Sequence, residues 1–123
     1  MQKIFLLIAS ISGALSVAIG AFGAHGMRAF LEANNRFDTF ETAVRYQFYH
    51  TFLLLMIGLL MNQFQTKTME WAGWLCFAGI LVFSGSLYIL CATGIKWLGA
   101  ITPVGGLMFI ASWLLLGISV FKK

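Results

Sequence analysis

Seven side chains that could take part in chemistry occur singly in or beside long apolar stretches: His25, Arg45, Gln47, His50, Ser84, Tyr88 and Thr102. Two histidines at similar depth could ligate a haem iron or another metal. No spaced third ligand or cofactor motif accompanies them, so we expect neither a metal nor a cofactor. Isolated polar groups in apolar surroundings are usually paired, and we favour mutual hydrogen bonding that ties helix ends together.

Catalysis is poorly supported by the same residues. The chain has no serine–histidine–acid or metalloprotease pattern. Its four acidic residues all flank the apolar stretches: Glu32, Asp38, Glu41 and Glu70. We therefore expect no enzyme. A proton-coupled carrier generally needs a carboxylate inside the membrane, which weakens a transporter interpretation without removing it.

The elements that position these residues follow from the charge pattern. All charged residues lie outside four uncharged stretches, at 4–24, 46–64, 71–95 and 97–121. A helix needs about 20 apolar residues to cross a bilayer core about 30 Å thick, and backbone amides in hydrocarbon must bond internally. The sequence predicts an all-α fold, an integral membrane four-helix bundle, with transmembrane helices at about 4–24, 46–64, 71–93 and 98–121. We expect residues 1–123 to form one polytopic membrane domain with both termini on the same side.

Composition agrees with this assignment. The chain is 60% hydrophobic and 10% charged, whereas soluble domains average about 25% charged residues. The net charge of +4 arises from basic residues scattered beside apolar runs, as at a membrane surface. We expect membrane lipids as partners and no nucleic acid. Lysine and arginine are balanced between the two sides of the membrane. We slightly favour an orientation with both termini on the inner side.

The segment between the first two stretches has helical periodicity. Its apolar residues recur on one face and its charged residues on another: Phe37, Phe40, Val44 and Phe48 against Asp38, Glu41 and Arg45. Glu41 and Arg45 have the favourable i, i+4 order. We predict an amphipathic helix that lies in the interface between the first and second membrane helices and runs into the second.

Small residues mark the expected helix contacts. Ser12, Ser16, Gly20 and Ala24 follow each other in steps of four along the first helix, and such a ridge lets another backbone approach closely. Pro103, Gly105 and Gly106 lie early in the fourth helix, where they predict a helix start or bend. We expect packing within one bundle. The alternative is that part of this surface pairs with a second copy in a homo-oligomer.

Four motifs carry a resemblance to a known family. They are GAFGAHG at 20–26, YQFYH at 46–50, FSGSLY at 83–88 and ITPVGG at 101–106. With these motifs the chain resembles the domain of unknown function 423 family of small bacterial inner-membrane proteins. The resemblance implies a multi-pass protein of the cell (inner or plasma) membrane, and no reaction. We expect a non-enzymatic protein that acts by helix packing, oligomerisation, or binding a lipid or partner. The alternatives are a small transporter or channel subunit and, third, a haem- or metal-binding protein.

Overall fold

The fold is helical throughout the described part of the chain. A computed structural model describes residues 1–122, and it contains these elements in order: α1 Gln2–His25, α2 Arg28–Ala33, α3 Phe37–Leu60, α4 Lys67–Gly79, a π-helical turn Ile80–Ser84, α5 Gly85–Thr93, a 3-10 turn Lys96–Ala100, and α6 Thr102–Lys122. Four of the resulting helical segments are long and apolar enough to cross a membrane: Gln2–His25, Phe37–Leu60, Lys67–Thr93 and Lys96–Lys122. The protein is an all-α membrane bundle.

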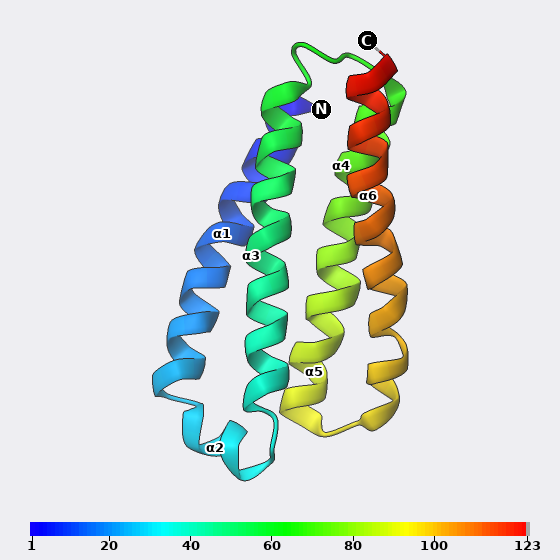
Figure 1. Ribbon diagram of the computed structural model, residues 1–123. Helices are drawn as coiled ribbons and strands as arrows, with labels where there is room; N and C mark the ends of the chain where they lie inside the picture. Colours follow the sequence, from blue (N-terminus) through cyan, green and yellow to red (C-terminus); the bar gives the residue numbers. More distant parts are fainter. Residues whose placement is uncertain (123) are drawn as a thin grey trace.

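The four long segments form two closely packed pairs. Figure 1 shows α1 beside α3, and the continuous column of α4, the π-helical turn and α5 beside α6. The start of α1 and the end of α6 lie at the same end of the bundle, and α2 lies at the opposite end (Figure 1). This arrangement agrees with the prediction that both termini share one side.

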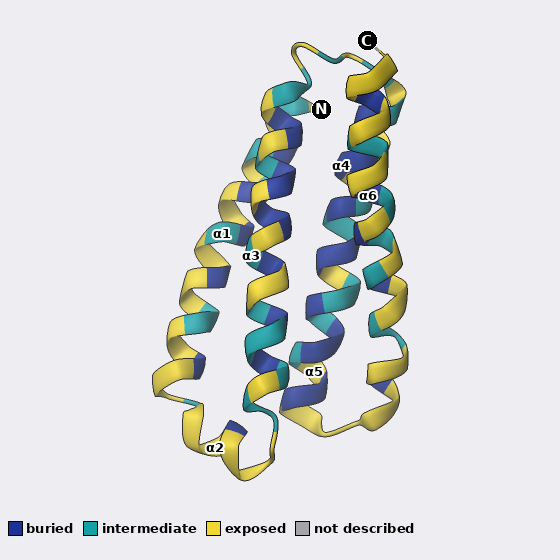
Figure 2. Ribbon diagram, viewed as in Figure 1, coloured by how far each residue is buried: buried dark blue, intermediate teal, exposed yellow. Residues whose placement is uncertain are grey.

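Burial distinguishes central from peripheral helices. In the membrane-spanning windows of α3 and of Lys67–Thr93, 44% of residues are buried, but only 22% in those of α1 and of Lys96–Lys122. Figure 2 shows the outer faces of α1 and α6 as mostly exposed. Their exposed side chains are large and apolar, such as Leu7, Val17, Leu107 and Leu114. In a bilayer these faces contact lipid.

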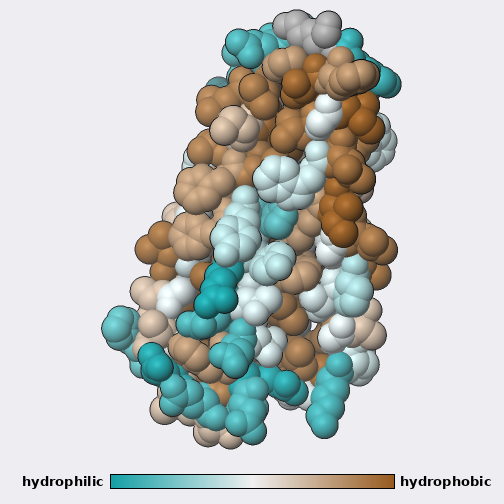
Figure 3. Space-filling view, in the orientation of Figure 1, coloured by the Kyte–Doolittle hydropathy of each residue, from teal (hydrophilic) through white to brown (hydrophobic). Residues whose placement is uncertain are grey.

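Polar residues gather at the two ends of the bundle. Figure 3 shows a hydrophobic belt bounded by hydrophilic residues at both ends. At the end with the termini, the Thr66 hydroxyl caps α4 by accepting a hydrogen bond of 3.0 Å from the Met69 amide, as N-cap residues do. At the other end Gly94 ends α5 with a φ of 73°, a left-handed conformation that glycine adopts without steric cost.

The amphipathic segment differs from its prediction. Residues 37–45 do not form a separate helix on the membrane surface, because they are the first turns of the continuous helix α3. Their apolar face packs inside the protein: Phe40 and Ala43 are buried, and the Phe40 ring lies against Gly23 of α1. Packing against α1 therefore takes the place of a separate helix lying flat on the membrane surface.

Glycines allow the closest helix contacts. A Cβ atom on Gly105 would lie 2.5 Å from the backbone nitrogen of Phe83, and one on Gly73 would lie 2.2 Å from the Phe5 ring. Among the other residues predicted to pack, Ser12 and Ser16 are buried and Gly20 is partly buried near Val44. Gly106 is also partly buried, while Ala24 and Pro103 are exposed.

Candidate functional site: a polar layer beside a lateral groove

A buried polar layer joins α1, α3 and α5 near the middle of the bundle. Gln47 is at its centre: the Tyr88 hydroxyl donates to the Gln47 carbonyl oxygen, and the Gln47 amide nitrogen donates to the Ser12 carbonyl at 3.2 Å. The Ser12 and Thr51 hydroxyls are 2.6 Å apart. Because interhelical hydrogen bonds in membranes are individually modest, this network fixes orientation more than it adds stability.

His50 belongs to a second layer, between α3 and α6. Its Nδ1 lies 2.8 Å from the Tyr46 carbonyl, and its Nε2 lies 3.1 Å from the indole Nε1 of Trp113. A carbonyl only accepts and an indole N–H only donates, so these partners together require a neutral imidazole with the proton on Nδ1. The ring also stacks on Phe109, with centroids 3.4 Å apart. His50 is thus engaged on both nitrogens and on one face.

Small hydroxyl side chains connect helices through backbone carbonyls. Ser84 donates to the Ala43 carbonyl and Ser112 to the Ala72 carbonyl, each at 2.7 Å. These bonds join the π-helical turn to α3 and α6 to α4. Such hydroxyls satisfy their own donors within the bundle, which leaves the helix surfaces apolar toward lipid.

The residues predicted to share one cluster are divided among several sites. Gln47 and Tyr88 bond directly, whereas His50 faces α6 and Ser84 bonds to the α3 backbone. The Thr102 hydroxyl lies 2.6 Å from that of Ser86. Two of the seven lie apart from these layers: Arg45 pairs with Glu41 on the outside of α3, and His25 is exposed at the end of α1.

His25 therefore does not share a network with His50. Within residues 1–122, no hydrogen bond of the His25 side chain is found, and no group of three histidine, cysteine or acidic residues is arranged to hold a metal. Our sequence analysis missed Thr51 and Trp113 as partners. Thr51 follows Gln47 by one helical turn, which was a usable signal, but Trp113 is one apolar residue among many.

A lateral groove opens beside the Gln47 layer. α1 touches α4 through Phe5, whose ring centroid is 5.1 Å from that of Trp74. Farther along, a groove of about 260 Å³ separates α1 from the π-helical turn; it is lined by Ile8, Ile11, Ser12, Leu15, Gln47, Phe77, Ile80 and Leu81. The carbonyl oxygen and amide nitrogen of Gln47 both bond within the bundle, so the groove presents mostly apolar carbon.

These features define a small multi-pass helical membrane protein. The family model described as protein of unknown function (DUF423) matches residues 19–106, and the chain belongs to this family. It is 48% identical to the UPF0382 membrane protein SH2409 of Staphylococcus haemolyticus over 121 residues, which cover 98% of each chain. It is 41% identical to the UPF0382 membrane protein YwdK of Bacillus subtilis over 122 residues, again 98% of each. No solved structure matches the chain.

Proposed function

We propose that this membrane protein is non-enzymatic and binds a lipid whose acyl chain lies in the lateral groove between α1 and the π-helical turn. The observation that carries the proposal is the groove itself, about 260 Å³ in volume and lined by apolar side chains except for Ser12 and Gln47. Its α1 residues, from Ile8 to Leu15, lie near the middle of that helix, at hydrocarbon depth. The molecule available to fill it there is a lipid chain.

The size and chemistry of the groove favour a chain over a compact polar ligand. Pockets for drug-sized molecules usually measure about 300–1,000 Å³, and this groove, at about 260 Å³, is below that range. A void beside apolar walls would forfeit dispersion contacts, which a flexible chain restores. The hydroxyl and amide groups nearby already have partners in the bundle.

Other hydrogen bonds within the bundle support the part of the proposal that the protein is not an enzyme. A nucleophile must be within reach of a general base with a free lone pair. His50 uses both ring nitrogens, toward Tyr46 and Trp113. Ser84 and Ser112 donate to backbone carbonyls.

Native mass spectrometry with dioleoyl phosphatidylcholine tests this proposal. Leu15 lines the groove and is 50% exposed, whereas Leu7 is 60% exposed on the same helix and lies outside the groove. Leu15→Trp should fill the groove and reduce the fraction of protein carrying one lipid, while Leu7→Trp should retain it. Equal lipid retention by the two variants would refute the groove as the binding site.

Assembly with a second copy is the other candidate. Ser10, Ala14 and Ala18 are exposed in steps of four on α1, and small residues at this spacing allow close helix pairing. We expect Ala14→Cys, in a chain with Cys76 and Cys91 replaced by alanine, to form a disulfide-linked dimer in vesicles. Leu107→Cys on α6 is the control, and equal crosslinking at both positions would argue against an α1 interface.

A further inference from the structure

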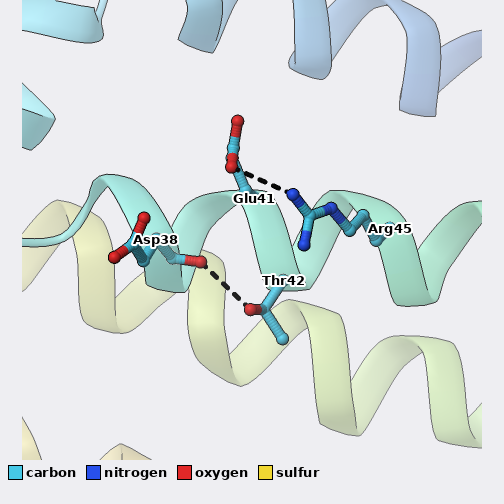
Figure 4. A network of polar contacts seen from close by, with 4 residues as sticks. All are labelled: Asp38, Glu41, Thr42 and Arg45. Atoms are coloured by element: carbon cyan, nitrogen blue, oxygen red, sulfur yellow. Dashed lines mark hydrogen bonds and ion pairs between the residues drawn. The ribbon is translucent and has the colours of Figure 1, made fainter.

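A charge pair lies in the first turns of α3, next to its uncharged part. The Arg45 guanidinium is 3.2 Å from the Glu41 carboxylate, and the two side chains are 61% and 42% exposed. Figure 4 shows both on one side of α3, joined by a dashed line, while Thr42 bonds to the Asp38 carbonyl. The pair is accessible from outside the bundle.

The length of α3 sets the depth of this pair. The uncharged part of the helix, residues 46–60, is roughly 22 Å long at 1.5 Å per residue, and a bilayer core is about 30 Å thick. Arg45 directly precedes this uncharged part and Glu41 lies one turn earlier, which places the pair near the boundary between headgroups and hydrocarbon. At this depth phospholipid headgroups are the abundant polar partners.

A groove adjoins the pair on the α1 side. It has a volume of about 160 Å³ and is lined by Gly20, Ala24, Phe37, Phe40, Val44 and the two charged residues. The lining is apolar at its base and charged at its rim. It differs from the lateral groove in every lining residue, so the two are separate sites.

We propose that this groove and its charged rim bind the headgroup of a zwitterionic phospholipid with a primary ammonium, phosphatidylethanolamine. Its phosphate accepts hydrogen bonds from Arg45, and its ammonium donates to Glu41. The opposite charges of the rim match those of the headgroup in sign and in adjacency. The first methylenes of the lipid chain contact Val44 and Phe40.

The hydrogen-bonding capacity of different headgroups makes the site selective. A primary ammonium has three N–H donors for the Glu41 carboxylate, whereas the trimethylated ammonium of phosphatidylcholine has none. Phosphatidylglycerol has no cation and leaves Glu41 beside an additional negative charge. Charge-assisted hydrogen bonds are the stronger kind, so the site favours phosphatidylethanolamine over both.

Native mass spectrometry with three dioleoyl lipids of matched chains tests the inference: phosphatidylethanolamine, phosphatidylcholine and phosphatidylglycerol. We expect the unaltered protein to bind phosphatidylethanolamine about tenfold more tightly than the other two. Glu41→Gln should abolish the preference over phosphatidylcholine, and Arg45→Gln should weaken binding of all three at this site. Asp38→Asn, which removes a carboxylate on the same helix outside the groove, should keep the preference.

Several results would overturn this assignment. They are equal binding of the three lipids by the unaltered protein, a preference for phosphatidylglycerol, and a preference that survives Glu41→Gln. If Asp38→Asn also lost the preference for phosphatidylethanolamine, that preference would come from the net charge of the protein and not from Glu41. The Glu41 and Arg45 side chains are substantially exposed, so their substitution should leave the fold intact. A thermal melt of each variant checks that it folds. Leu15→Trp separates the two sites: it removes lipid from the lateral groove and leaves the headgroup preference intact.

Discussion

At the scale of single residues, His50 shows how a polar side chain is accommodated inside the bundle. Its two nitrogens have partners of opposite character, the Tyr46 carbonyl and the Trp113 indole. The partners determine the tautomer, and stacking on Phe109 determines the ring plane. A histidine held in this way connects α3 to α6.

Removal of the indole donor tests this description. Trp113→Phe should leave Nε2 of His50 without its partner and cost about 0.6–1.7 kcal/mol, as such bonds do in membranes. We expect a lower melting temperature in detergent. Trp97→Phe is the control, because Trp97 is 64% exposed in the 3-10 turn. Equal melting temperatures for the two variants would show that the His50–Trp113 bond does not contribute.

Residue types were easier to predict than partners. An isolated histidine or glutamine in an apolar run must find a hydrogen bond, which the sequence indicates directly. The choice between partners depends on helix rotation. His50 and Gln47 are less than one turn apart on α3, yet one faces α6 and the other faces α1 and α5.

At the scale of helices, the small-residue ridge of α1 shows the same dependence on rotation. A helix advances by about 100° per residue, so steps of four drift by about 40° each. Ser12 and Ser16 are buried, Gly20 is partly buried and Ala24 is exposed. Gly23, which the step of four skips, returns to the buried face and meets Phe40. The sequence was enough to predict that small residues of α1 form a close helix contact. It did not show that Gly23, and not Ala24, is the last residue of that contact.

The contact between α6 and the π-helical turn gives a matched prediction at neighbouring positions. A Cβ on Gly105 would lie 2.5 Å from the Phe83 backbone nitrogen, whereas one on Gly106 would lie 4.0 Å from the Phe83 ring. Gly105→Ala should destabilise the protein by about 1–3 kcal/mol, as overpacking does. Gly106→Ala should be neutral or stabilising, because alanine favours helix by about 1 kcal/mol over glycine.

Thermal unfolding in detergent checks this pair of variants. The helical signal should be lost at a lower temperature for Gly105→Ala than for Gly106→Ala. The reverse order, or no difference, would mean that α6 does not approach the π-helical turn as closely as described.

At the scale of the whole molecule, the charge pattern was enough to predict the fold, whereas the grooves depend on contacts between helices. Four uncharged stretches were enough to predict four membrane helices, because every span needs length and apolar side chains. The grooves lie between side chains of different helices, and no local sequence pattern encodes such an arrangement. The same is true of the first turns of α3, which continue the membrane helix and pack on α1 instead of forming a separate helix flat on the membrane surface.

Topology is directly testable through accessibility. Lys3→Cys and Lys122→Cys, each in a chain with the buried Cys76 and Cys91 replaced by alanine, should react with a membrane-impermeant maleimide from the same face of a vesicle. Lys96→Cys should react from the opposite face. Reaction of Lys3→Cys and Lys122→Cys from different faces would contradict four crossings.

The central claim is that the surface beside α1 holds lipid in a defined groove, and photo-crosslinking in vesicles tests it most directly. A phosphatidylcholine carrying a diazirine in its acyl chain is activated, and the adducts are mapped by mass spectrometry. Leu81 in the groove and Leu107 on the outer face of α6 are similarly exposed, at 59% and 67%. We predict that adducts accumulate on Leu81 and Leu15 well above those on Leu107. Equal labelling of the groove and of α6 would contradict it.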